Sequence, residues 1–429
     1  MVTTRKRSFY VLSLLVLAGT ALGLGFLALP DETLFYWTGE TNRFAQARAL
    51  WNMLLDQARP PLNLAPDAPI QHRPDNPFGV NTFLEGEVEV AKRERTLQMI
   101  REAGYGWIRQ PFVWSDIEIH GKGDFEDRRN VPYRSAWEKY DNIVDLAERY
   151  GLKIIARVGA PPKWAHRGYA DLGDFGPPAD FNDFADFVEV LARRYVGRIR
   201  YWQIWNEPNI YPEWGNQRSN PEDYTRLLCL AHDRLKAVDP SNVVIAAALA
   251  PTLAQDGGGH PGGGFNDLIF LERMYAAGAA RCFDVAAAQG YGLFSGPFDR
   301  RRDPLQTNVA RHMLMRDIMV RHGDAHKPIW LSEVNWNAVP NDPAIADLTR
   351  YGMVTPEEQA RFVPLLYERA RAEWPWIGVM SVWFFKRPSD QERNQSWYYF
   401  RMLEPDFTPT PLWESMRAYI RQRQSDERR

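Results

Sequence analysis

The sequence predicts an α/β fold in which eight parallel strands and their helices close into a single (β/α)8 barrel. From Phe78 to the C-terminus, short apolar segments alternate with amphipathic ones, a pattern typical of a parallel sheet with crossover helices. Eight of the apolar segments have strand length, and eight strands are the number that closes such a barrel. They are residues 78–83, 107–111, 153–158, 199–206, 243–249, 283–289, 328–333 and 379–384.

The amphipathic segments carry signals for the start of a helix. Ser135 with Glu138, and Thr355 with Glu358, match the capping box, in which each side chain binds the backbone N–H of the other residue. Pro221 follows an asparagine, and proline is common at the first position of a helix. These signals predict helices that begin at about residues 135, 221 and 355.

A long uncharged segment precedes the barrel. Residues 9–29 contain no charged side chain and, as a helix, would span about 30 Å, the thickness of a bilayer core. Arg5, Lys6 and Arg7 come just before it, so the positive-inside rule predicts a membrane anchor with the short N-terminus in the cytoplasm. A cleaved signal peptide is the alternative, and either interpretation places the barrel outside the cytoplasm.

A helix and a linker are expected between this segment and the barrel. Residues 40–58 carry apolar side chains three and four positions apart, which predicts an amphipathic stem helix packed on the barrel. A membrane-surface helix is less favoured, because the polar face is not markedly basic. Residues 59–77 contain six prolines and indicate a stiff linker. The expected parts are an anchor or signal segment at 1–30, stem and linker at 31–77, and the barrel at 78–429.

Composition excludes several classes of function. The net charge of −2 and the pI near 6.5 give no indication of nucleic acid as a partner. The eight histidines form no H-x-H or H-E-x-x-H motif, so we expect no metal, and no cofactor is required. Cys229 and Cys282 are too few for a disulfide framework, and we interpret both as small buried hydrophobic residues.

Two strands end in a glutamate. The sequence YWQIWNEPNIYPEW places Glu207 directly after the fourth predicted strand, among aromatic residues that would desolvate its carboxyl group and raise its pKa. The sequence PIWLSEVNW ends the seventh strand at Glu333. Because the carboxyl ends of barrel strands share one mouth, we expect both carboxyl groups there, although 126 positions separate them (333 − 207).

These two motifs resemble those of the clan A glycoside hydrolases, and WNEPN followed by aromatic residues most resembles family 39 and its relatives. The resemblance covers the chain from about Phe78 and implies a (β/α)8 barrel of the TIM type. It further implies that Glu207 is the general acid/base and Glu333 the nucleophile of a retaining reaction. In such enzymes the two carboxyl groups lie about 5–5.5 Å apart.

The resemblance also implies roles for other residues at the strand ends. Arg109 is expected to orient the nucleophile, Asn206 to bind a sugar 2-hydroxyl group, and Tyr291 to hydrogen-bond the nucleophile. Trp383 matches an aromatic platform under the sugar. Gln289 stands where family members often have a histidine, and this departure puts one usual sugar contact in doubt.

Several further residues have competing interpretations. Trp164 and His166 follow the third strand and are candidates for substrate binding, with loop packing as the alternative. The three arginines at 300–302 follow the sixth strand and, with Lys386 and Arg387, could contact an acidic sugar at the mouth. Solvated loop charge is the favoured interpretation of these basic residues.

The expected function is hydrolysis of O-glycosidic bonds in oligo- or polysaccharides by a retaining β-glycosidase. A membrane-tethered carbohydrate-binding protein without turnover is the alternative from another class. A transglycosylase, in which a sugar hydroxyl group replaces water in the second step, would use the same residues.

Overall fold

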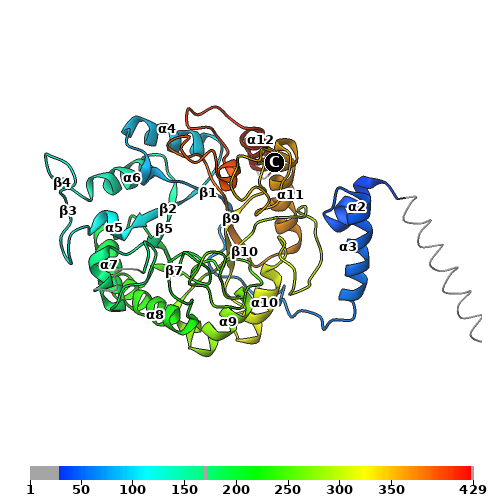
Figure 1. The fold of residues 1–429 in the computed structure, drawn as a ribbon, viewed down its shortest axis with the longest axis horizontal. Helices are drawn as coiled ribbons and strands as arrows, with labels where there is room; N and C mark the ends of the chain where they lie inside the picture. Colours follow the sequence, from blue (N-terminus) through cyan, green and yellow to red (C-terminus); the bar gives the residue numbers. More distant parts are fainter. Residues whose placement is uncertain (1–28, 168–171, 427–429) are drawn as a thin grey trace, which may run out of the picture.

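The computed structural model describes residues 29–167 and 172–426, and their fold is the predicted barrel (Figure 1). Eight parallel strands form its wall, and all eight predicted strands are confirmed. They are β1 (Phe78–Asn81), β2 (Trp107–Val113), β5 (Lys153–Gly159), β6 (Tyr201–Ile204), β7 (Val243–Ile245), β8 (Ala286–Gln289), β9 (Ile329–Val334) and β10 (Ile377–Val382).

The strands follow the order β7-β6-β5-β2-β1-β10-β9-β8. The two outer strands of this order meet through parallel bridges from Ile245 to Val285 and from Leu249 to Ala288, which close the ring. A separate antiparallel pair, β3 (Glu126–Asp127) and β4 (Arg134–Ser135), forms a small hairpin outside the barrel.

Helices surround the barrel. The α-helices are α4 (Val90–Glu102), α5 (Trp114–Ile117), α6 (Glu138–Arg149), α7 (Phe181–Arg194), α8 (Pro221–Val238), α9 (Asp267–Ala276), α10 (His312–Arg321), α11 (Pro356–Glu373) and α12 (Pro411–Asp426). Short 3-10 helices are η1 (Leu84–Gly86), η2 (Lys163–His166), η3 (Ala279–Cys282) and η4 (Ser396–Phe400). Thr355 and Glu358 form the predicted capping box, and Pro221 begins α8. The Ser135 prediction was wrong: Ser135 lies in β4, and α6 begins three residues later without a side-chain cap.

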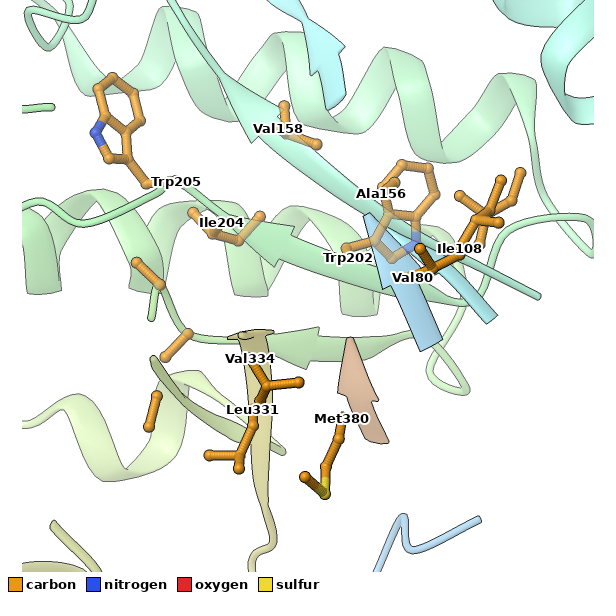
Figure 2. Packing of buried hydrophobic residues seen from close by; sticks show 14 of the residues in the cluster. Val80, Ile108, Ala156, Val158, Trp202, Ile204, Trp205, Leu331, Val334 and Met380 are labelled. Atoms are coloured by element: carbon orange, nitrogen blue, oxygen red, sulfur yellow. The ribbon is translucent and has the colours of Figure 1, made fainter. Parts of the chain in front are cut away.

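Two apolar layers hold the strands in place. Residues on the outer faces, such as Ile108, Trp202 and Leu331, pack toward the helices (Figure 2). Inside the barrel, near the amino ends of the strands, Trp107 lies 5.2 Å from Trp330 between ring centroids. Side chains of a strand alternate between its faces, so the residue two positions further on points into the barrel as well. For Trp107 on β2 that residue is Arg109, which begins a polar layer above the apolar one.

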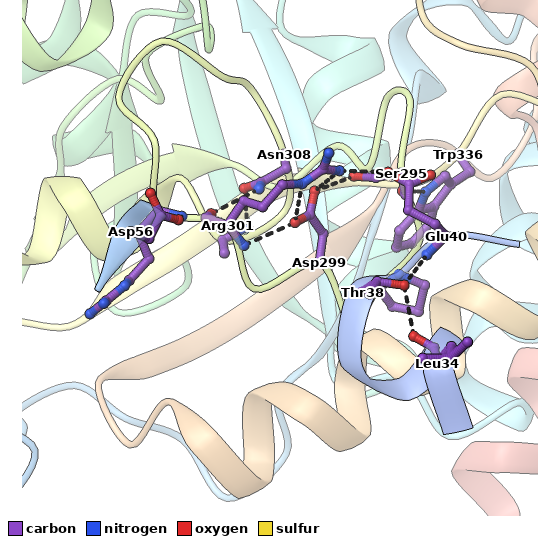
Figure 3. Close-up of polar contacts among 12 residues, drawn as sticks. Leu34, Thr38, Glu40, Asp56, Ser295, Asp299, Arg301, Asn308 and Trp336 are labelled. Atoms are coloured by element: carbon purple, nitrogen blue, oxygen red, sulfur yellow. Dashed lines mark hydrogen bonds and ion pairs between the residues drawn. The ribbon is translucent and has the colours of Figure 1, made fainter. Parts of the chain in front are cut away.

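Two helices precede the barrel, α2 (Asp31–Thr38) and α3 (Arg43–Asp56), and both lie at the edge of the molecule (Figure 1). Phe35 of α2 stacks on Phe362 of α11, with 5.5 Å between ring centroids. Arg301 bridges Glu40 and Asp299 through ion pairs of 2.6 Å each (Figure 3). These contacts fix the two helices to the barrel.

The predicted stem helix is present as α3, but the face that it turns to the protein differs from the prediction. The buried residues of α3 are Gln46, Ala49 and Asp56, whereas Phe44 and Trp51 of the expected packing face are 88% and 62% exposed. Polar contacts position the helix instead, since the Asp56 carboxylate accepts a 2.9 Å hydrogen bond from the Arg302 backbone.

The predicted membrane anchor falls almost wholly outside the described residues. In the part of the chain that the structure describes, no helix is both long and apolar enough to cross a bilayer.

The proline-rich segment lies along the amino ends of the strands. The indole N–H groups of Trp330 and Trp107 donate to the carbonyl groups of His72 and Asn76, at 3.2 and 2.9 Å. Both indoles belong to the apolar layer inside the barrel. The segment therefore covers the face of the barrel opposite its mouth.

The interpretation of the two cysteines was wrong, because Cys229 and Cys282 form a disulfide. Cys229 lies on α8 and Cys282 at the end of η3, and their Cα atoms are 4.7 Å apart. In the sequence, a buried cysteine with apolar neighbours looks the same whether its thiol is free or in a disulfide. Only the packing of η3 against α8 shows that the two sulfur atoms meet.

Candidate active site

A bulge in β9 turns Glu333 toward the mouth of the barrel. Ala288 of β8 pairs with Leu331, but the next residue, Gln289, pairs with Glu333, so β9 holds one extra residue here. A β-bulge interrupts the alternation of side chains and changes the direction in which one of them points. Glu333 therefore reaches the cluster of Arg109 and Tyr291.

Two donors hold the Glu333 carboxylate, which is only 5% exposed. Arg109 Nη1 donates to Oε1 at 2.8 Å, and the Tyr291 hydroxyl group donates to Oε2 at 2.6 Å. Burial and the charge of Glu333 raise the pKa of Tyr291 well above its usual value, so Tyr291 keeps its proton as a donor. Both contacts fix the orientation of the Glu333 carboxyl group at the mouth of the barrel.

Glu207 lies on the loop after β6, where the backbone is unusual. Trp205 and Glu207 have φ angles of 73° and 37°, a region that residues other than glycine seldom adopt. Hydrogen bonds to the segment after β7 fix this loop. The Glu207 N–H donates to the Ala248 carbonyl at 3.1 Å, and the Asn209 side chain exchanges two hydrogen bonds with the Ala250 backbone. Such backbone strain is concentrated at functional sites.

The electrostatic surroundings of Glu207 oppose its ionisation. Burial raises its pKa well above the usual value, and the negative charge of Glu333 raises it further. One contact acts in the other direction: Gln289 Nε2 donates to Glu207 Oε1 at 2.6 Å, which favours the charged form. The two carboxyl groups thus differ in their partners, with cation and hydroxyl on Glu333 and a neutral amide on Glu207.

Arg109 connects most of the polar layer. Its guanidinium group, 2% exposed, donates from Nε to Gln203 at 2.6 Å, and from Nη1 and Nη2 to Asn81 and Asn206 at 2.8 Å each. Nη1 also contacts Glu333. The acceptors lie on β1, on β6 and the segment just after it, and on β9, so the buried cation on β2 sets the relative positions of four strands.

Three other predicted site residues, Trp383, Trp164 and His166, have no hydrogen bond to Arg109 among the described residues. Trp383 follows β10 and is partly exposed, with Phe83 at 5.3 Å between ring centroids. Trp164 packs edge-on against Trp114 and donates its N–H to a backbone carbonyl, so it stabilises its own loop. His166 is 6% exposed, bonds the Gly176 carbonyl, and forms part of a cavity wall.

That cavity has a volume of about 790 Å³ and opens beside Asn206. Small-molecule sites typically measure about 300–1,000 Å³. The charged side chains of its wall are Glu85, Arg157, Lys163, Asp174, Glu213 and Arg387. Asn206 lines this cavity and also accepts a hydrogen bond from Arg109, so the cavity is continuous with the Arg109 network.

Arg157 stands out in this wall. It lies near the end of β5, is half-buried, and forms no hydrogen bond or ion pair with another described residue. Burial raises the pKa of both Glu85 and Glu213, while the charge on Arg157 opposes that rise. The cavity therefore holds guanidinium and carboxyl groups able to bind a polar ligand.

The basic residues after the sixth strand do not reach the mouth. Arg300 pairs with Glu373 and Arg301 with Glu40 and Asp299, on the side where α2 packs. The interpretation as solvated charge was wrong for Arg301, which is 7% exposed in an ion-pair network, whereas the Arg300 side chain is 38% exposed. Arg387 differs, because it lines the cavity and stacks over Phe83, 3.9 Å from the ring centroid.

Several residues of the site were not predicted from the sequence. Asn81 and Gln203 lie within strands. Because strand side chains alternate between two faces, counting along each strand could have indicated that both point into the barrel. Arg157 and Glu213 carried no motif. Nothing in the sequence indicates the β9 bulge.

Among residues 29–167 and 172–426, no group of three or more His, Cys, Asp and Glu side chains could hold a metal ion. The groups at the mouth can donate a proton and supply a carboxylate nucleophile.

Comparisons with known proteins agree on the fold. No family model matches the chain. A family 39 glycoside hydrolase from Bacteroides cellulosilyticus WH2 is 21% identical with a TM-score of 0.57, over 81% of this chain and 64% of that one. A monomeric β-xylosidase from Caulobacter crescentus CB15 is 16% identical with a TM-score of 0.54, over 81% and 69%.

Sequence matches are shorter. Coniferin β-glucosidase of Pinus contorta is 24% identical over 144 residues, 32% of this chain and 26% of that enzyme. A β-xylosidase of Caldicellulosiruptor saccharolyticus is 27% identical over 111 residues, 23% of this chain and 22% of that one. The matches thus span about a quarter of these enzymes. Together with the structural likeness, they show that the chain has the TIM-barrel fold seen in family 39 glycoside hydrolases of clan A.

Proposed function

We propose that this protein is a retaining β-glycosidase that hydrolyses O-glycosidic bonds of oligo- or polysaccharides. The observation that carries the proposal is that two carboxyl groups at one mouth have different surroundings. Glu333 contacts a cation and a hydroxyl donor, whereas burial and the charge of Glu333 keep a proton on Glu207. A nucleophile and a general acid need this difference.

In the first step, the Glu333 carboxylate attacks the anomeric carbon while the bond from that carbon to the leaving oxygen breaks. Glu207 gives its proton to the leaving oxygen, and a covalent glycosyl-enzyme forms. The negative charge of Glu333 is then consumed, which lowers the pKa of Glu207. Glu207 next takes a proton from water, whose oxygen attacks the anomeric carbon and releases Glu333.

The comparisons support this proposal at the level of glycosidase activity, since the relatives named above are a β-glucosidase, two β-xylosidases and a family 39 glycoside hydrolase. Transglycosylation shares the first step and differs in the acceptor of the second. Binding without turnover was an alternative because Gln289 replaces a histidine, but its amide contacts Glu207 as a donor. Product analysis separates these three functions.

The cavity beside Asn206 supports a substrate longer than one sugar unit. Arg157 has a guanidinium group without a protein partner among the described residues, and Glu213 offers an acceptor on the same wall. A sugar hydroxyl group would satisfy both, because it can accept a hydrogen bond from Arg157 and donate one to Glu213. We place a second sugar unit there.

The location of the enzyme is also proposed. The disulfide between Cys229 and Cys282 is typical of an oxidising compartment. With the uncharged segment 9–29, it supports a barrel held outside the cytoplasm by an N-terminal anchor.

Azide tests the roles of the two glutamates. E333A and E207A should each lower kcat on an oligosaccharide by on the order of 10⁴-fold. In E333A, azide attacks the anomeric carbon directly, so a β-aryl glycoside gives the α-glycosyl azide. In E207A, a good leaving group departs without a proton, and azide releases the glycosyl-enzyme as the β-glycosyl azide. NMR of the products identifies the anomer.

E213A is the control for this experiment, because it removes a neighbouring carboxyl group that the mechanism does not use. We expect no azide product from it. The same anomer from E333A and E207A would contradict the assigned roles, and a wild-type protein that binds sugars without turnover would establish the binding alternative.

Gln289 should lower the pKa of Glu207, the proposed general acid. Its N–H stabilises ionised Glu207 and so lowers the pKa; removing it in Q289L should raise that pKa. The alkaline limb of the kcat/KM profile reports loss of the proton on Glu207, so it should move to higher pH by about one unit. Q289H keeps an N–H donor and should stay near the wild-type limb. A limb that stays in place in Q289L would show that Gln289 does not act on the acid.

Arg157 should affect longer substrates selectively. R157M is expected to raise KM for an oligosaccharide by about tenfold, because a hydrogen bond to a charged group is lost. An aryl monoglycoside does not fill the cavity, and its KM should change little. R226M removes an exposed arginine of α8 and serves as the control. Equal effects of R157M on both substrates would contradict a second sugar site in the cavity.

A further inference from the structure

Helix α3 exposes an apolar stripe to solvent. Phe44, Trp51, Leu54 and Leu55 are 88%, 62%, 62% and 53% exposed. At about 100° per residue, these four positions fall within an arc of about 100° on the helix. The residues that α3 buries, Gln46, Ala49 and Asp56, point in other directions. The amphipathic helix therefore packs its less apolar side on the protein and leaves its most apolar side uncovered by any described residue.

The stripe lies next to the end of the uncharged segment. Arg43, the first residue of α3, donates from Nη2 to the carbonyl of Leu29 at 2.8 Å and pairs with Asp31. Leu29 is the last residue of the 21 positions without charge. If that segment crosses a bilayer, the first turn of α3 lies at the bilayer surface.

The chemistry of α3 fits such a surface. Trp51 is a residue type enriched at the boundary between lipid and water, and Leu54, Leu55 and Phe44 supply the apolar area of an interfacial helix. Arg48 is exposed at the edge of the stripe, where its guanidinium group can reach anionic headgroups. A helix of 14 residues extends about 21 Å and can lie flat along the surface.

We propose that α3 lies on the outer surface of the membrane, with Phe44, Trp51, Leu54 and Leu55 in its interfacial region. This inference rests on the proposed N-terminal anchor and adds a second contact with the lipid. Because the Glu40–Arg301–Asp299 ion pairs and the Asp56 contact fix α2 and α3 to the barrel, the second contact also holds the barrel in one orientation (Figure 3).

The test uses the full chain in vesicles of phosphatidylcholine and phosphatidylglycerol, three to one. Both native cysteines are in the disulfide, so a single introduced cysteine can carry a nitrobenzoxadiazole dye. W51C places the dye on the stripe. V196C places it on an exposed residue of the loop before β6 and is the control. Quenching by nitroxide-labelled lipid is compared with quenching by aqueous iodide.

We expect lipid nitroxide to quench the dye at position 51 at least fivefold more than at position 196, and iodide to show the reverse order. Protein that floats with vesicles while iodide quenches both dyes equally would overturn the inference and leave the anchor standing. Protein that does not float would overturn both. A cross-link between two copies through position 51 in detergent would assign the stripe to a dimer instead.

A second variant separates this inference from the glycosidase proposal. F44S/L55S changes the stripe without touching the barrel mouth, so hydrolysis of a soluble aryl glycoside should stay within twofold of wild type. The dye at position 51 should become accessible to iodide in this variant. If the dye remained within reach of lipid nitroxide only, apolar contact of α3 would not be what holds it there.

Discussion

The Arg109 guanidinium group is the constraint on which the site depends. It lies two residues beyond Trp107 on β2, so the apolar floor of the barrel and the polar layer above it follow from a single strand. A buried cation is costly unless each donor has an acceptor. Gln203, Asn81, Asn206 and Glu333 supply those acceptors, and they come from strands that are distant in sequence.

The same interaction produces the asymmetry between the two carboxyl groups. Arg109 pairs with Glu333 and leaves Glu207 with a neutral amide partner, Gln289. Burial and the charge of Glu333 raise the pKa of Glu207, so a proton on Glu207 is favoured. The proposed acid and the proposed nucleophile are therefore distinguished by their neighbours, since both residues are glutamates at the ends of strands.

The sequence predicted the barrel because each strand carries a local apolar pattern with polar residues at its end. The strand ends indicated both glutamates as candidates, and the resemblance to clan A glycoside hydrolases implied Arg109, Asn206 and Tyr291. Features that depend on contacts between distant segments were missed: the β9 bulge, the Gln289–Glu207 bond and the disulfide. The apolar pattern also predicted α3, yet could not show that the ion pairs of Glu40 and Arg301 would turn its apolar side away from the barrel.

Trapping of the glycosyl-enzyme would identify the residue that attacks the anomeric carbon. The protein would be incubated with 2-deoxy-2-fluoro β-glycosides carrying good leaving groups, and the intact mass and its peptides measured. If Glu333 is the nucleophile, we expect an adduct of one fluorosugar on Glu333, which also forms in E207A and is absent from E333A. An adduct on Glu207 or Glu213, or turnover of natural substrates with inversion and no adduct from any sugar of the panel, would contradict it.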